Sequence, residues 1–315
     1  MQNAFSCELY APSQSKMVRF NELTIKYLKT IVKYIQNEDD AGLCCYFNKI
    51  LNDLGPDKYE SGYDRLDKFC ILLGIRIISI GPSIDLQFTC ESTNKEFTYR
   101  MDLFKILQKI ADLEDLYKNN TLKINDNTSI ILGFPSKLVY DNYDTIAFEC
   151  ISSVIINNKV YDIKSLGSKE KDEIFALLPG TISSDIIKYI TQKQKILNDL
   201  VFIDVKSPFD PDKEVISMNF DGLNNALMEF VKTLFRMNID EIYNLIYILT
   251  TKLSFTAEYI ENNLTFAECM VYINKLKHEL AEKEKAMKKQ GEQSMMSSNS
   301  PGMPMPVQAP YTGIE

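Results

Sequence analysis

Apolar residues recur at two different spacings along this chain, and together the spacings predict both strands and helices. At residues 84–90 apolar and polar side chains alternate, so that every second side chain lies on one face of an extended segment. The alternation returns at residues 201–206. In much of the remaining chain apolar residues stand three or four positions apart, which is typical of a helix with one buried face. We therefore expect a fold of the α+β class.

Short strands and helices are expected in the first 80 residues. Residues 5–9 and 17–20 read as strands that are separated by a proline-containing break. Asn21 can cap a following helix, and the acidic run at 38–40 can start another. A third helix, largely apolar, is expected over residues 64–77, or a helix that runs into a strand.

Two β-hairpins are expected, and each is followed by a helix. The strand at 84–90 meets a polar turn and a return strand with Phe97 and Tyr99, after which Asp102 can cap a helix. The strand at 201–206 meets a proline-containing turn, a return strand at 215–220 and a leucine-bearing helix. This repeated order is a weak internal repeat of pattern, with little residue identity.

Between the two expected hairpins, the spacing of apolar residues predicts both strands and helices. Residues 130–134 and 146–156 read as further strands. Ser168 is a plausible N-cap of a helix whose first turn is acidic, and Ile186 and Ile190 belong to the apolar face of the next helix.

The last third of the chain reads as helix followed by a tail. Thr265 and Glu268 form a capping box that starts a helix with Ile273, Leu276 and Leu280 on one face. This helix becomes wholly polar near its end, and then methionine, serine and proline dominate, so that no core can form. The expected divisions are a mixed domain at 1–221, a helical domain at 222–290 and a flexible tail at 291–315.

The composition is that of a globular protein without disulfides. Hydrophobic residues make up 45% of the chain and charged residues 25%. A net charge of -8 argues against nucleic acid as a partner, because that affinity rests on clustered lysine and arginine. The 7 cysteines are odd in number and lack a C-x-x-C pair, which favours a reducing compartment. No secretory signal and no membrane span are expected.

Few residues offer catalytic or metal-binding chemistry. His278 is the one histidine and lies in a charged stretch, where we expect it to be solvated. Cys90 ends a strand at the position of a zinc-knuckle ligand, but no second cysteine follows it, so both hairpins are knuckle-like without metal ligands. Glycine-rich phosphate loops are also missing. We assign no catalytic, cofactor-binding or metal-binding residue, and we expect no enzymatic activity.

Several segments stand in a recognisable order along the chain: 9–13 (LYAPS), 16–20 (KMVRF), 75–81 (IRIISIG), the hairpin strands at 86–90 and 97–103, 131–136 (ILGFPS) and 201–223. This order resembles the baseplate hub subunit and hub-assembly family of T-even-type contractile-tailed phages. The resemblance covers roughly residues 5–235, and it departs from the family where cysteine pairs are often found in the hairpins.

The resemblance implies a structural or assembly protein of the tail baseplate hub that acts by protein–protein binding. Its partners would be other phage tail and baseplate proteins, with an oligomer possible, in the virion or in the host cytoplasm during assembly. The expected contacts are the terminal helix with its tail and the exposed hairpin turns. Two alternatives stay open: a cellular helical adaptor or scaffold unrelated to phages, and an enzyme built from Asp, Glu, Tyr and Lys without a readable motif.

Overall fold

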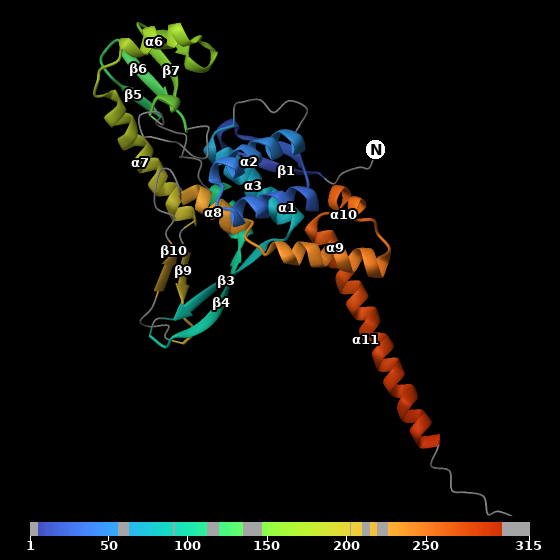
Figure 1. Cartoon of the computed structure of the whole chain (residues 1–315). Helices are drawn as coiled ribbons and strands as arrows, with labels where there is room; N and C mark the ends of the chain where they lie inside the picture. Colours follow the sequence, from blue (N-terminus) through green and yellow to red (C-terminus); the bar gives the residue numbers. More distant parts are fainter. Residues whose placement is uncertain are drawn as a thin grey trace, which may run out of the picture. The chain divides into compact units, whose positions relative to one another are not determined.

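The computed structural model of the chain combines helices with small antiparallel sheets, which confirms the α+β class (Figure 1). The structure describes residues 6–55, 63–90, 92–111, 120–134, 147–201, 203–209, 215–218 and 226–297. The chain divides into two compact units, Met1–Cys269 and Met270–Glu315. The domain boundary that we expected at 221/222 and the tail after residue 297 lie outside the described residues.

The chain begins with a hairpin of two strands, β1 (Ser6–Ala11) and β2 (Lys16–Asn21), joined by the short helix η1 (Pro12–Gln14). Both strands were predicted. Asn21 does not cap the next helix, because strand pairing continues through Asn21 opposite Ser6. The N-cap residue is Thr24, which also forms a β-bridge with Thr265.

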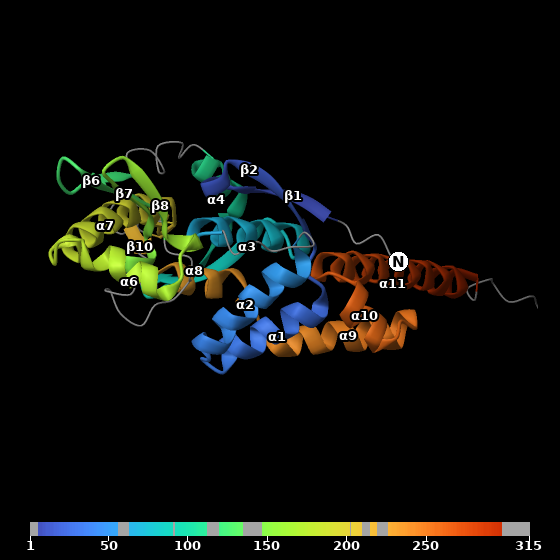
Figure 2. The same cartoon turned by 90° about the horizontal axis from the view of Figure 1, so that it is seen from above.

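A helical layer follows from α1 (Ile25–Gln36) and α2 (Asp40–Leu54). The side chain of Asp39 accepts the backbone N–H of Gly42 at 2.8 Å, so the acidic run starts α2 as expected. Helix α1 contacts α2 as well as α9 (Ile239–Leu253) and α10 (Ala257–Asn263), which come from the far end of the chain (Figure 2). Segments that are distant in sequence therefore pack together in the first unit.

Helix α3 (Arg65–Ser79) is the centre of this unit, and all but one of its side chains are buried. It contacts β1, η1, α4 (Leu103–Ala111) and α8 (Ala226–Leu234). A helix with apolar side chains around most of its circumference must be covered on most sides, and the buried charged residues of α3, such as Asp67 and Arg76, then need hydrogen-bond partners from other elements. This explains why the helix expected at 64–77 has no polar face in the sequence.

Both predicted hairpins are present, and each precedes a helix in the chain. The first consists of β3 (Ser83–Cys90) and β4 (Lys95–Asp102), and Asp102 accepts the N–H of Phe104 at 3.0 Å at the start of α4. The second consists of β9 (Ile203–Lys206) and β10 (Val215–Met218). Residues 219–225, where we expected the following helix to open, lie outside the described residues.

A four-stranded sheet, in the order β5-β6-β7-β8, forms a second core. Apolar side chains of β6 and β7 pack with those of α6 (Ser168–Ala176) and α7 (Ile182–Val201). The bounds of the strands are Thr121–Lys123 for β5, Thr128–Leu132 for β6, Ile151–Ile156 for β7 and Lys159–Asp162 for β8.

This region contains the main corrections to the expected elements. The strand that we expected at 146–156 begins only at Ile151, because residues 147–149 are helical. The N-cap of α6 is Gly167 and not Ser168, and Glu170 accepts the Gly167 N–H at 2.9 Å. Strands β5 and β8 were not predicted, since three or four residues are too few to show a period.

The last element that the structure describes is α11 (Phe266–Ser297), which begins at the predicted capping box. The Thr265 N–H donates to Glu268 at 2.8 Å, and the Glu268 N–H donates to the Thr265 hydroxyl at 3.2 Å. The helix continues past residue 291, where we expected the tail to begin.

Candidate functional site

The two hairpins meet through aromatic side chains and form one projection, which we call the hairpin arm (β3, β4, β9, β10 and residues 207–209; Figure 1). The rings of Phe88 and Phe97 are stacked across β3 and β4, with centroids 5.8 Å apart. The rings of Phe97 and Phe209 form an edge-to-face pair with centroids 6.3 Å apart, and the Lys95 ammonium lies 5.1 Å from the centre of the Phe209 ring. These contacts join a turn near residue 209 to a hairpin more than 100 positions earlier.

The arm has one apolar face and one polar face because its strands keep the alternation seen in the sequence. Ile84, Leu86 and Phe88 are half-buried, while the residues between them are exposed. On the exposed face Arg100 pairs with both carboxylate oxygens of Asp85 at 2.7 and 2.8 Å. Phe209 stays 43% exposed even within its aromatic contacts.

Arg76 holds the base of the arm. Its guanidinium donates to the carbonyl oxygens of Leu234 at 2.6 Å, Gly81 at 2.5 Å and Ser83 at 3.3 Å. These carbonyls belong to the end of α8, the turn after α3 and the start of β3. Burial lowers the pKa of Arg76 to about 10. One buried cation therefore connects the elements that lead into and out of the two hairpins.

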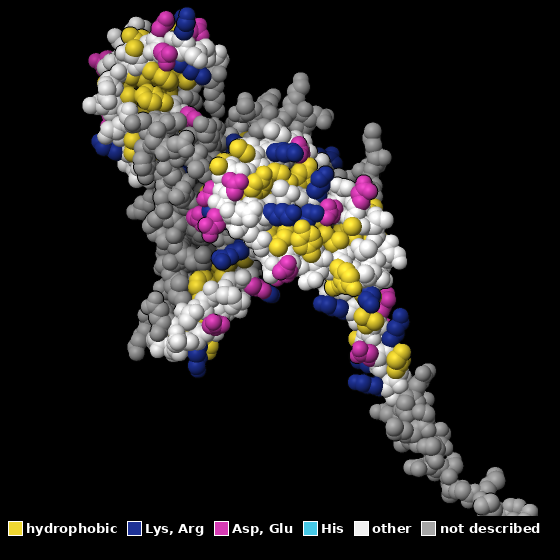
Figure 3. Space-filling view, viewed as in Figure 1, with side chains coloured by type: hydrophobic (Ala, Val, Ile, Leu, Met, Phe, Trp, Pro, Cys, Tyr) yellow, Lys and Arg dark blue, Asp and Glu magenta, His cyan; other side chains and the backbone are white. Residues whose placement is uncertain are grey.

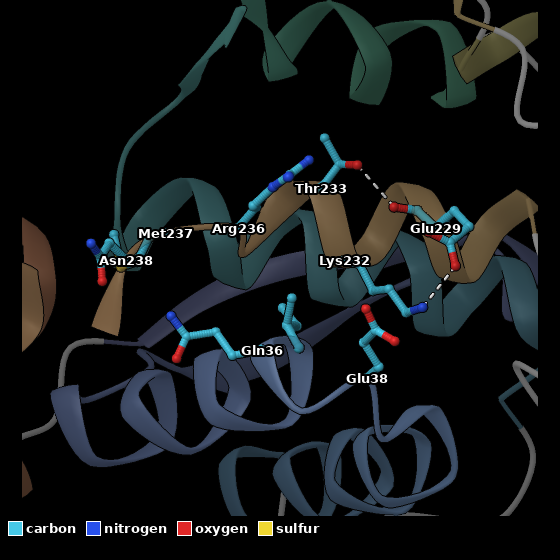
Figure 4. A pocket seen from close by; sticks show the side chains of 9 residues that line it. Gln36, Glu38, Glu229, Lys232, Thr233, Arg236, Met237 and Asn238 are labelled. Carbon is cyan, nitrogen blue, oxygen red and sulfur yellow. Dashed lines mark hydrogen bonds and ion pairs between the residues drawn. The ribbon is translucent and has the colours of Figure 1, made fainter. Parts of the chain in front are cut away.

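Two surface hollows lie beside the base of the arm, and Thr233 and Arg236 line both of them. One, of about 470 Å³, is bounded by β3 and these two residues. The other, of about 700 Å³, opens between α8 and the end of α1 (Figure 4).

The larger hollow is lined by charges of both signs. Lys232 forms ion pairs with Asp40 at 2.6 Å and with Glu229 at 2.7 Å. Partial burial alone would lower the pKa of Lys232, but the hydrogen bonds to these two carboxylates raise it. Glu38 and Arg236 also line the hollow (Figure 4).

The residues considered for chemistry in the sequence lie apart from one another. His278 is exposed on α11, with its Nδ1 3.7 Å from a Glu282 oxygen. Cys90 is buried, and its sulfur lies 3.3 Å from the Ser92 hydroxyl. Among the residues that the structure describes, no group of three or more His, Cys, Asp or Glu side chains could hold a metal ion. In the same part of the chain no helix is long and apolar enough to cross a membrane.

The sequence predicted the strands of the arm but did not identify Arg76 and Phe209 as the residues that join its parts. Arg76 was visible only as a charge inside an apolar run, which is a signal of a buried and fully hydrogen-bonded cation. Phe209 stands in a proline-containing turn, where an aromatic residue has no role in strand alternation. The sequence does not show which carbonyl oxygens Arg76 binds or which ring Phe209 contacts, so the role of either residue is visible only in the folded structure.

The structure thus defines a class of α+β protein with a projecting aromatic hairpin arm on a helical body. The chain belongs to the family described as T4 bacteriophage base plate protein, whose family model matches residues 3–206. No curated protein and no solved structure matches the chain. The match confirms the resemblance at the level of a phage baseplate structural protein, located in the virion tail with other tail proteins as partners. It does not support a cellular adaptor unrelated to phages.

Proposed function

We propose that this chain is a hub subunit or hub-assembly protein of the baseplate, and that it acts by binding other tail proteins without catalysis. The observation that carries the proposal is the hairpin arm. Phe209 of the arm stays exposed, and exposed aromatic side chains are common anchors in protein–protein interfaces.

The geometry of the arm supports this role in a second way. Among the described residues, β3 pairs only with β4 and β9 only with β10, so each hairpin has open strand edges. An open edge can accept a strand of a partner through backbone hydrogen bonds. The two hollows at the base of the arm add polar and charged groups next to this edge.

The proposal is tested by mass spectrometry of purified phage particles together with a pull-down from infected cells. The chain at a fixed copy number in mature particles would identify a structural hub component. Absence from particles with capture of hub proteins would identify an assembly factor. If the chain is absent from particles and captures no hub protein, the proposal fails.

The role of the arm is tested in the same pull-down with Phe209→Ser. We expect capture of the tail partner to fall about tenfold or more, because interface aromatics are often worth about 2 kcal/mol or more. Phe104→Ser is the matched control, since Phe104 is an exposed phenylalanine on α4. Equal capture by both variants would exclude the arm as the contact.

A further inference from the structure

Helix α11 has apolar side chains at a seven-residue spacing that continues to Met287. Phe266, Ile273, Leu280 and Met287 are each seven positions apart. Leu276 occupies the intermediate position after Ile273, and Lys283 occupies the same position one repeat later. Such a spacing keeps one narrow stripe of a helix facing a partner helix.

Within the single chain the second half of this stripe is exposed to water. Leu280 is 49% exposed and Met287 is 70% exposed. Figure 3 shows hydrophobic side chains alternating with charged ones along this helix. The first half is more covered, since Ile273 is buried and Leu276 is half-buried. Among the described residues, no element therefore covers the second half of the stripe, although a seven-residue spacing is typical of a helix that packs against another helix.

We infer that α11 pairs with α11 of a second copy of this chain as a short antiparallel coiled coil. A parallel pair is disfavoured by its charges. It would place the two Lys283 side chains opposite each other in the seam, and Glu279 of each helix next to Glu284 of the other. Like charges at such positions weaken the pairing, and here no opposite charge offsets them.

The antiparallel register removes both conflicts. In it Leu276 lies opposite Met287 of the second copy, and Leu280 lies opposite Lys283, whose methylene groups can cover it while the ammonium reaches water. Lys277 then flanks Glu284 of the second copy, and the symmetry of the pair gives this contact twice. The charged residues of two α11 helices therefore attract each other in the antiparallel orientation and repel each other in the parallel one.

The contact is short, so we expect a dimer that depends on protein concentration. Few apolar residues per helix fall within the overlap, and interfaces of this size belong to the weak class. Helix α11 lies outside the residues that match the baseplate family model. The inference is therefore independent of the proposed function, and either can fail while the other stands.

The test uses the full-length chain in analytical ultracentrifugation with three samples. Lys277→Glu alone and Glu284→Lys alone each place two like-charged pairs across the antiparallel seam, so each is expected to shift toward monomer. An equimolar mixture of the two variants has opposite charges at both contacts and is expected to restore the dimer as a heterodimer. Lys285→Glu, which lies on the outer side of the helix, is the matched control and leaves the dimer unchanged.

Each other result overturns the inference. A wild-type chain that stays monomeric up to the highest soluble concentration excludes self-pairing. A dimer that Leu280→Glu leaves intact uses another surface. A dimer that Leu280→Glu disrupts, but whose two single charge variants are not rescued by mixing, is not antiparallel in this register. All of these positions are exposed on a helix, so circular dichroism suffices to check that each variant folds.

Discussion

At the scale of single residues, the fold depends on a few buried polar groups that each connect separate segments. Asp67, fully buried on α3, accepts the backbone N–H of Ser13 at 2.8 Å and that of Asp64 at 3.0 Å, and it also accepts the Ser13 hydroxyl. The same carboxylate thus caps α3 and holds the break between β1 and β2. Buried polar groups of this kind are costly unless they are hydrogen-bonded, and both carboxylate oxygens of Asp67 accept hydrogen bonds.

Glu22 gives the residue-scale prediction, because its environment opposes its charge. Partial burial, and then the neighbouring Glu268, raise the pKa of Glu22 above its ordinary value. A raised pKa in the folded state means that this group favours folding when it is protonated and that the contribution is lost as the pH rises through the folded pKa. We expect Glu22→Gln to unfold at a higher denaturant concentration than wild type at pH 7.

The stabilisation by Glu22→Gln should shrink as the pH falls below the ordinary range of a glutamate, since the wild-type side chain is then neutral as well. Denaturant unfolding at pH 7 and at low pH measures both parts. Glu8→Gln, at an exposed position of β1, serves as the control and should leave the midpoint unchanged. A stabilisation that is the same at both pH values would contradict the explanation.

At the scale of elements, the chain is held together by close approaches between helices and strands. Gly74 lies in the middle of α3, where glycine weakens a helix by about 1 kcal/mol relative to alanine. A Cβ at this position would lie 2.3 Å from Cδ2 of Leu9 on β1. The glycine is therefore explained by the contact between α3 and β1.

Gly74→Val should lower the free energy of unfolding by about 1–3 kcal/mol, because the added side chain overlaps Leu9. Leu9→Ala makes room for it, so we expect the double variant to lose less than the sum of the two single losses. Chemical denaturation of the four proteins measures this coupling. Gly180→Val is the control, since a Cβ there meets no atom within 4 Å. If the losses of the two single variants are additive in the double variant, overlap with Leu9 is not the cause of the destabilisation by Gly74→Val.

At the scale of the whole molecule, Arg76 connects the hairpin arm to the helical body through its hydrogen bonds to three carbonyl oxygens. We expect Arg76→Leu to lower the free energy of unfolding by about 2–4 kcal/mol, because three carbonyl oxygens lose a charged donor. Amide hydrogens of β3 and β4 should exchange faster in hydrogen–deuterium exchange. Arg100→Leu removes an exposed ion pair of the same arm and should change stability little. Equal effects of both variants would mean that Arg76 does not anchor the arm.

The elements that the sequence predicted are those whose pattern is local. The alternation at residues 84–90 survives in β3, and the capping box at Thr265 and Glu268 starts α11, because each depends on neighbours two to four positions away. Strands β5 and β8 were missed because a strand of three or four residues is stabilised by its pairing partners and not by its own period. The N-cap expected at Ser168 was wrong for a different reason: the local contact that starts α6 is made one residue earlier, between the Gly167 N–H and Glu170.

The sequence by itself therefore determined the α+β class, both hairpins and the heptad spacing of α11, since residues close in the chain define each of them. Tertiary structure alone decided that Phe209 meets Phe97, that Arg76 binds carbonyls of three segments, and that Leu280 and Met287 stay exposed. The physical reason is that burial and hydrogen bonding are satisfied by whichever groups the folded chain brings near. Many of those groups are more than 100 residues away.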